Sequence, residues 1–230
     1  MTNYFDINYP ESEYSVTAYP QKLCDYLTKK YLRDFHEGAN LLDIGCGRGS
    51  YLVGFGRCKF SVSGVDKRLD STETIKTFHV QECDLEHEPL PFNEGAFDVI
   101  FSKSVIEHMQ NADHILSEIY RILSPEGIAL ILTPAWEKQY KFFYNDYTHV
   151  KPYTRKGLQN ALKLNRFHSV ECNYFIQLPL VWRYPFMKYF TDIIALLPDS
   201  LTWKDTEEKQ HRKLVRFSKE KMLLAVGRKR

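Results

Sequence analysis

An apolar run, an acid and three glycines at alternate positions stand together in the segment LLDIGCGRGS, residues 41–50. Glycine lets a backbone turn tightly and approach a ligand closely, because no Cβ stands in the way. Such a turn presents backbone N–H groups, and a helix that begins near Ser50 would add the positive end of its dipole. The loop is therefore suited to a ligand that carries a carboxylate or a phosphate.

Asp43, two residues before the first glycine, indicates which kind of ligand this loop binds. A carboxylate repels a diphosphate and attracts an ammonium group, so Asp43 favours a ligand with a cationic end. The glycine spacing agrees, since dinucleotide sites read GxGxxG whereas this loop reads GxGxG, with Ser50 in place of the third glycine. Taken alone, the loop is also compatible with an ordinary turn between a strand and a helix.

The elements that must position this loop follow from the apolar pattern. Residues 40–44 have the length and apolarity of a buried parallel strand, and further strands are expected at 59–65, 79–83, 96–102, 127–133, 169–175 and 221–227. In a βαβ unit an acid after the second strand lies beside the first loop, where Asp66 could accept hydrogen bonds from ribose hydroxyls. The alternative for Asp66 is a solvated loop aspartate.

In chain order, the segments DIGCGRG, GVD, CDL, FDVIFSKSVIEHM and RILSPEGIALILTP resemble the class I S-adenosylmethionine-dependent methyltransferases. The resemblance covers residues 38–134 and points to a mixed small-molecule and glycan-type group whose loop reads DxGCGxG. It implies a Rossmann-like α/β fold: a doubly wound, seven-stranded sheet, mostly parallel, with an antiparallel last strand. These motifs are specific for the fold and the cofactor, but they recur over many kinds of acceptor.

The resemblance implies S-adenosylmethionine as the cofactor. Asp43, Gly45 and Gly47 should line its methionine part, Asp66 its ribose, Asp84 and Leu85 its adenine, and Ser102 the floor beneath the sulfonium. Residues beside these positions, and a tyrosine of the N-terminal stretch that could close over the cofactor or simply cover the sheet, complete the expected set. The expected cofactor-binding residues are Asp43, Gly45, Cys46, Gly47, Asp66, Lys67, Asp84, Leu85, Ser102 and Tyr14.

The segment DYTHVKPYT after the fifth strand is expected to be the acceptor loop, because doubly wound sheets bind ligands beyond the carboxyl ends of their strands. Thr154 is a suitable N-cap for a helix over residues 154–164. A hydroxyl acceptor must lose its proton during methyl transfer, and histidine accepts protons near neutral pH. We rank His149 first as the base, then His108 and Asp146; the alternative is that these side chains only hold the loop. On a helix Glu107 and His108 would point about 100° apart, so at most one should face the cleft. No metal site is expected.

A chain of 230 residues with 43% hydrophobic content is long enough for one well-buried domain. We expect a single methyltransferase domain with an N-terminal cap (1–37), a cofactor-binding core (38–134), an acceptor loop and helix (135–166) and a helical insertion (176–219). The chain has no signal-peptide pattern, and its five cysteines form no CxxC pair, which indicates a cytoplasmic protein.

The insertion carries an apolar stripe that starts near Pro185. The stripe could pack in the core, form a homodimer contact or act as a lid against a membrane. Residues 201–230 carry a net charge of +6, although the whole chain carries +2, so peripheral membrane contact stays open.

The sequence thus predicts an enzyme that methylates a hydroxyl of a small-molecule or glycan-type substrate. The apolar insertion is compatible with a substrate that is lipid-linked. An RNA or protein methyltransferase is the second interpretation, but the NPPY-type motif is missing and no nucleic-acid partner is expected. The third is a non-catalytic, cofactor-binding partner of a related enzyme.

Overall fold

The computed structural model describes residues 18–68, 73–197 and 213–230. Its strands form one seven-stranded sheet in the order β3-β2-β1-β4-β5-β7-β6. The bounds are β1 Asn40–Ile44, β2 Ser61–Asp66, β3 His79–Glu82, β4 Phe97–Lys103, β5 Leu123–Pro134, β6 His168–Phe175 and β7 Met222–Arg228. Strands β1 to β5 pair in parallel, whereas β7 runs antiparallel to both of its neighbours, β5 and β6. The predicted doubly wound sheet with an antiparallel last strand is confirmed.

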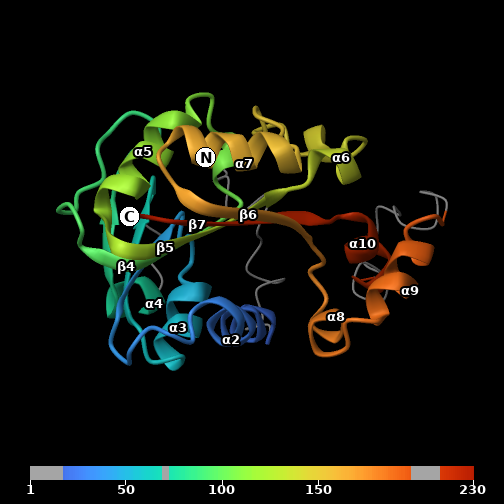
Figure 1. Cartoon of the computed structure of the whole chain (residues 1–230), viewed down its shortest axis with the longest axis horizontal. Coiled ribbons are helices and arrows are strands. Elements are labelled where there is room, and N and C mark those ends of the chain that lie inside the picture. Colours follow the sequence, from blue (N-terminus) through green and yellow to red (C-terminus); the bar gives the residue numbers. More distant parts are fainter. Residues whose placement is uncertain (1–17, 69–72, 198–212) are drawn as a thin grey trace.

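Helices cover both faces of the sheet, as Figure 1 shows. Helices α2 (Tyr19–Tyr31) and α3 (Ser50–Arg57) lie on one face, and α5 (Ala112–Ile122) and α7 (Arg155–Leu164) lie on the other. Because successive side chains of a strand point to opposite faces, alternate residues of β5 supply the two cores. Ile128, Leu130 and Leu132 pack with α2 and α3, and Ala129 and Ile131 pack with α5 and α7.

The helix starts follow local sequence signals. The Thr154 hydroxyl accepts a hydrogen bond from the Gly157 N–H at 3.0 Å, which confirms it as the N-cap of α7. Helix α2 begins at Tyr19 with Pro20 in its first turn, where a missing N–H costs no hydrogen bond. The described residues also form the short elements α4 Glu73–Thr77, η2 Ile106–His108, α6 Trp136–Gln139, η3 Phe143–Asn145, α8 Pro179–Arg183, α9 Met187–Ile194 and α10 Lys213–Lys219.

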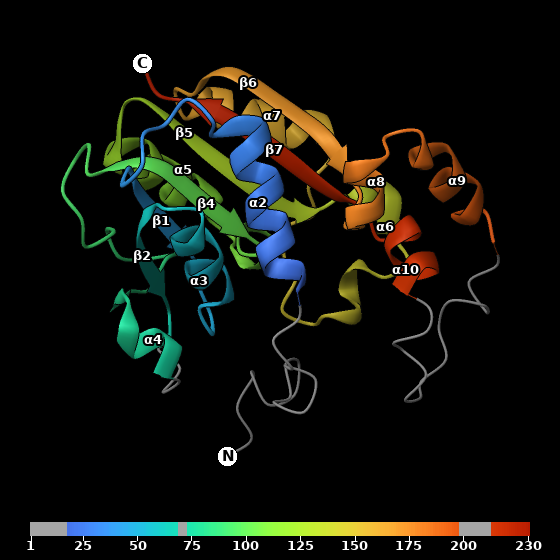
Figure 2. The same ribbon diagram turned by 90° about the horizontal axis from the view of Figure 1, so that it is seen from below.

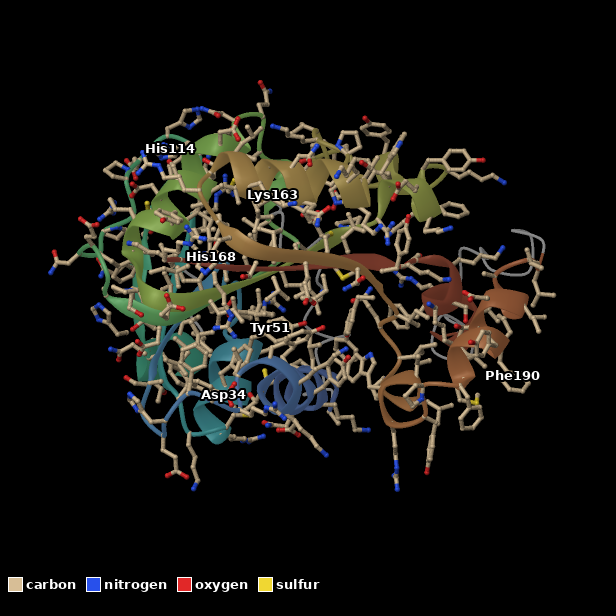
Figure 3. The ribbon with its side chains drawn as sticks, in the orientation of Figure 1. Asp34, Tyr51, His114, Lys163, His168 and Phe190 are labelled. Carbon is tan, nitrogen blue, oxygen red and sulfur yellow. The ribbon has the colours of Figure 1, made fainter. Side chains whose placement is uncertain are left out.

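Helices α8, α9 and α10 form a group at one end of the sheet (Figure 2). Within α9 the buried residue is Thr191, whereas Phe186, Tyr189, Phe190 and Ile193 are each more than half exposed. Figure 3 labels Phe190 on the side of this group that faces away from the sheet. The interpretation of the apolar stripe as core packing is therefore wrong, because these apolar side chains are exposed and the buried side chain of α9 is the polar Thr191. No helix among the described residues is both long and apolar enough to cross a bilayer.

Candidate active site

The loop between β1 and α3 depends on glycine. Gly45, Gly47 and Gly49 all have φ between 50° and 77°, in the left-handed region that favours glycine. At Gly45 a Cβ atom would also lie 2.3 Å from Cγ2 of Val105, so a side chain has no room there. The Gly45 N–H donates to the Val65 carbonyl at 2.8 Å. The loop is thus held between the end of β2 and the turn that follows β4.

Asp66 lies where the sequence predicted an acid beside this loop. Its two carboxylate oxygens accept hydrogen bonds from the Gly47 N–H at 2.8 Å and the Arg68 N–H at 3.2 Å. Burial raises the pKa of Asp66, against the lowering effect of these backbone donors. Each carboxylate oxygen has a further lone pair, so the group can accept hydrogen bonds from ligand hydroxyls while it holds the loop.

Asp43 is buried on β1, and its Oδ2 atom has no hydrogen-bond partner among the described residues. Burial and the nearby Asp66 raise the pKa of Asp43 to about 8, although Lys103 acts in the opposite direction. A buried carboxylate without a partner is costly, and a cationic ligand would remove that cost. This orphaned atom beside a glycine loop fits the ammonium group of an amino-acid-type cofactor.

The other predicted cofactor residues fall into two groups. Lys67 and Asp84 form an ion pair at 2.9 Å that joins the ends of β2 and β3, and this hydrogen bond lowers the pKa of Asp84 to about 2. The remaining side chains are buried: Ser102 on β4 beside Ile44, Leu85 in the core under α5, and Cys46 in a small cluster with Leu52 and Ile75. Tyr14 lies outside the described residues.

Glu107 stands in the 3₁₀ turn η2, directly after β4, and is fully buried. Its Oε2 accepts a hydrogen bond from the Thr133 hydroxyl at 2.8 Å, but its Oε1 has no partner among the described residues. Burial raises the pKa of Glu107 to about 7. The backbone carbonyl of Glu107 accepts hydrogen bonds from the N–H groups of Val150 and Lys151. Glu107 thereby ties the predicted acceptor loop, residues 146–154, to the turn that follows β4.

The imidazoles of His108 and His149 lie 4.8 Å apart, centroid to centroid. Nδ1 of His149 is 2.6 Å from the Phe143 carbonyl, which can only accept, so this nitrogen carries a proton. The Thr148 hydroxyl donates to Asp146 at 2.6 Å, so its oxygen accepts from Nδ1 of His108 at 2.8 Å. Because Nδ1 carries the proton in each ring, Nε2 of each neutral imidazole carries a lone pair. Burial, and then His149, lower the pKa of His108.

The structure thus brings together the three predicted catalytic residues, His149, His108 and Asp146, with Oδ2 of Asp146 3.9 Å from Nε2 of His149. Glu107 belongs to the same cluster, because Glu107, His108 and His149 each offer a ligand atom within 4.8 Å of the others. Glu107 and His108 stand on a single 3₁₀ turn, where Glu107 is fully buried and His108 is half-buried. Which of the two faces the acceptor stays a prediction.

Sequence reasoning missed two hydroxyls that orient this cluster. Thr133 lies at the end of β5, the edge where a doubly wound sheet places its ligands, and this position was its only signal. Thr148 lies two residues after Asp146, the spacing at which an aspartate caps its own turn, and both its N–H and its hydroxyl bond to Asp146.

Lys103, half-buried at the end of β4, is influenced electrostatically by both Asp43 and Glu107, and burial lowers its pKa.

Comparison with known proteins agrees with this geometry. The family described as "Methyltransferase domain" matches residues 16–171. Among curated relatives, a ubiquinone biosynthesis O-methyltransferase of Caulobacter sp. (strain K31) is 32% identical over 105 residues, 42% of this chain and 41% of that protein. A tRNA (carboxymethyluridine(34)-5-O)-methyltransferase of Xenopus tropicalis is 33% identical over 117 residues, 48% of this chain and 18% of that protein. The chain thus spans less than half the length of these relatives.

Solved structures share the fold. A SAM dependent methyltransferase from Archaeoglobus fulgidus superposes with a TM-score of 0.67 at 20% identity, covering 99% of this chain and 100% of that one. Phosphoethanolamine N-methyltransferase 2 from Haemonchus contortus gives a TM-score of 0.67 at 16% identity, covering 99% of this chain and 59% of that one. The sheet order, the glycine loop and the acid after β2 define a class I S-adenosylmethionine-dependent methyltransferase. The chain belongs to the methyltransferase domain family, is an enzyme, and uses S-adenosylmethionine as its cofactor.

Proposed function

We propose that this enzyme transfers the methyl group of S-adenosylmethionine to a hydroxyl oxygen of a small-molecule or glycan-type acceptor. The observation that carries the proposal is the pair of imidazoles, His108 and His149, whose Nδ1 atoms are both committed to protein oxygens. Each ring therefore keeps an Nε2 lone pair that can take a proton from a hydroxyl. The O-methyltransferase from Caulobacter, a partial relative, supports an oxygen acceptor.

The residues that would hold the cofactor lie at the ends of β1, β2 and β3. The unpartnered oxygen of Asp43 suits the cofactor's ammonium group, and the remaining lone pairs of Asp66 suit ribose hydroxyls. Leu85 and the Lys67–Asp84 ion pair stand where the adenine is expected. When bound, the cofactor supplies a methyl group that its sulfonium already activates.

The protein's own contribution is then positioning and removal of one proton. Holding two reactants in near-attack geometry supplies about 7 to 11 kcal/mol, whereas a general base contributes roughly 10²- to 10⁴-fold in rate. His149 is the first candidate for the base, because the Phe143 carbonyl fixes its ring and the Asp146 carboxylate, 3.9 Å from Nε2, stabilises the imidazolium that forms. His108 is held in the same way through Thr148 and Asp146.

The test is a screen of phenols, hydroxylated sugars and lipid-linked sugars with S-adenosylmethionine that carries a labelled methyl group. For an acceptor found in this way, the His149→Ala variant should keep its cofactor affinity and lose about 10²- to 10⁴-fold in turnover. The exposed His36 provides the matched control, and His36→Ala should leave turnover unchanged. An unchanged rate in His149→Ala would remove the base assignment, and methylation only of nitrogen or carbon would remove the proposal.

RNA is the second candidate acceptor. The tRNA methyltransferase from Xenopus tropicalis matches about half of this chain, and residues 201–230 carry a net charge of +6. Binding through such a basic segment would weaken steeply as salt is added. A tRNA-binding titration at two salt concentrations separates the candidates, because tight and salt-sensitive binding followed by label transfer to RNA would favour RNA. Cytoplasmic location and peripheral membrane contact stay predictions.

A further inference from the structure

We infer that Glu107, His108 and His149 bind a divalent transition-metal ion. One ligand atom of each side chain lies within 4.8 Å of the other two. Zinc bonds of about 2.0 to 2.2 Å place neighbouring ligand atoms ~3.4 Å apart in a tetrahedron. The cluster therefore needs to close by up to about 1.4 Å around an ion, which small shifts of the side chains and their loop can provide.

The second observation is the state of the Glu107 carboxylate. Glu107 is fully buried, its Oε2 accepts a hydrogen bond from Thr133, and its Oε1 has no partner among the described residues. A buried carboxylate oxygen without a donor or a cation is costly. Metal-ligating carboxylates in proteins are themselves hydrogen-bonded, as Oε2 of Glu107 is, so the free Oε1 is left to bind the ion.

The third observation concerns the outer contacts of the two imidazoles. A histidine that binds a metal donates its other ring N–H to a carbonyl, a carboxylate or another acceptor, which fixes the ring and its tautomer. Nδ1 of His149 contacts the Phe143 carbonyl at 2.6 Å, and Nδ1 of His108 contacts the Thr148 oxygen at 2.8 Å. Thr148 is in turn fixed by Asp146 at 2.6 Å. Both rings are therefore oriented as ligands before an ion arrives.

The ligand types select the ion. Two neutral imidazoles and one carboxylate suit zinc and other first-row transition metals, whereas Mg²⁺ and Ca²⁺ prefer sites made of oxygen. Three protein ligands leave a coordination position open, as in catalytic zinc sites. An acceptor hydroxyl at that position would lose its proton more easily, a consequence that rests on the proposed function. Because the ion would then occupy the Nε2 lone pair of His149, that ring would no longer be the base, and the hydroxyl proton would pass to water. Binding of the ion itself does not depend on the acceptor.

The test is a calorimetric titration of the chelator-treated full chain with ZnCl₂, without cofactor or acceptor. We expect one zinc per chain, loss of that site in His149→Ala and in Glu107→Gln, and an unchanged isotherm in His36→Ala. Thr148→Val, which removes an outer contact of His108, should weaken zinc binding roughly 10- to 100-fold. Should Glu107→Gln fail to fold, visible absorption of bound Co²⁺ in the parent chain and in His149→Ala provides the same comparison.

Two outcomes would overturn the inference: no stoichiometric zinc binding by the parent chain, or equal binding by His149→Ala. The outcomes for the two proposals differ. Methylation of a hydroxyl that persists at full rate in chelator, with no zinc bound, removes the metal site and leaves the proposed function. Zinc binding at this cluster in a protein that methylates no hydroxyl compound removes the proposed function and leaves the metal site.

Discussion

Thr133, near the end of β5, donates a hydrogen bond at 2.8 Å to Glu107, which follows β4, and both side chains are fully buried. This bond joins the ends of two neighbouring strands, and the backbone of Glu107 also holds Val150 and Lys151 of the predicted acceptor loop. The other oxygen of this carboxylate, Oε1, has no hydrogen-bond partner among the described residues, so the Thr133 hydroxyl is the side-chain donor that Glu107 has there.

Replacing Thr133 by valine should destabilise the protein by about 1 to 3 kcal/mol, because the buried carboxylate of Glu107 then loses its side-chain hydrogen-bond donor. Urea unfolding followed by circular dichroism measures the change. Thr133→Ser is the control, since it keeps the hydroxyl and removes one methyl group, which costs less than about 1 kcal/mol. Equal destabilisation in the two variants would show that packing, and not the hydrogen bond, holds this edge.

Gly45→Ala should destabilise the protein at the loop between β1 and α3 by two separate effects. A left-handed backbone costs alanine about 1 to 2 kcal/mol, and the contact with Val105 adds roughly 1 to 3 kcal/mol of overpacking. Gly38 has a similar φ of 85° but nothing within 4 Å of its Cβ position, so Gly38→Ala measures the backbone effect alone. Thermal unfolding of both variants gives the difference, and Val105→Ala combined with Gly45→Ala should recover part of it.

Cofactor binding should release a proton from Asp43. Its pKa of about 8 makes the uncharged form dominant at neutral pH, and a cationic ligand favours the charged form. Affinity for S-adenosylmethionine should therefore rise by up to about tenfold per pH unit between about pH 5.5 and 7, where the ligand's amino group stays charged. Calorimetry in buffers of different ionisation enthalpy counts the protons. Asp43→Asn should lose this slope, whereas the exposed Asp34→Asn should keep it; a pH-independent affinity in the parent chain would contradict the role of Asp43.

The unliganded enzyme should lose stability as pH rises from about 4.5 to 7. The folded-state pKa of Glu107, about 7, lies above its ordinary value of 4.5, so the native state binds more protons than the unfolded state between these values. Glu107 then lowers the free energy of unfolding by up to about 1.4 kcal/mol per pH unit between about pH 4.5 and 7. Glu107→Gln should reduce this slope in urea unfolding. A slope that is the same in both proteins would show that Glu107 titrates normally.

Most of the fold could be predicted because its signals are local. The strand at 40–44, the glycine loop, the helix start at Ser50 and the Thr154 cap depend on residues within a few positions of one another. The acid of Asp66 could be placed because the βαβ unit brings the ends of adjacent parallel strands together.

The rest depended on contacts that no local pattern encodes. The bonds from Thr133 to Glu107 and from His108 to Thr148 join segments 26 and 40 positions apart, so they follow from strand register and loop path. The apolar stripe of α9 indicated an apolar face but not what covers it, and the structure leaves Phe190 and its neighbours exposed. For the same reason, the meeting of Glu107 with both imidazoles was not foreseen.

The attachment of the acceptor loop has an evolutionary consequence. Val150 and Lys151 are anchored to a peptide oxygen of residue 107, which every amino acid possesses. Exchange of the side chain at that position leaves this anchor intact. The path of the predicted acceptor loop can thus be retained while the side chain at position 107 changes.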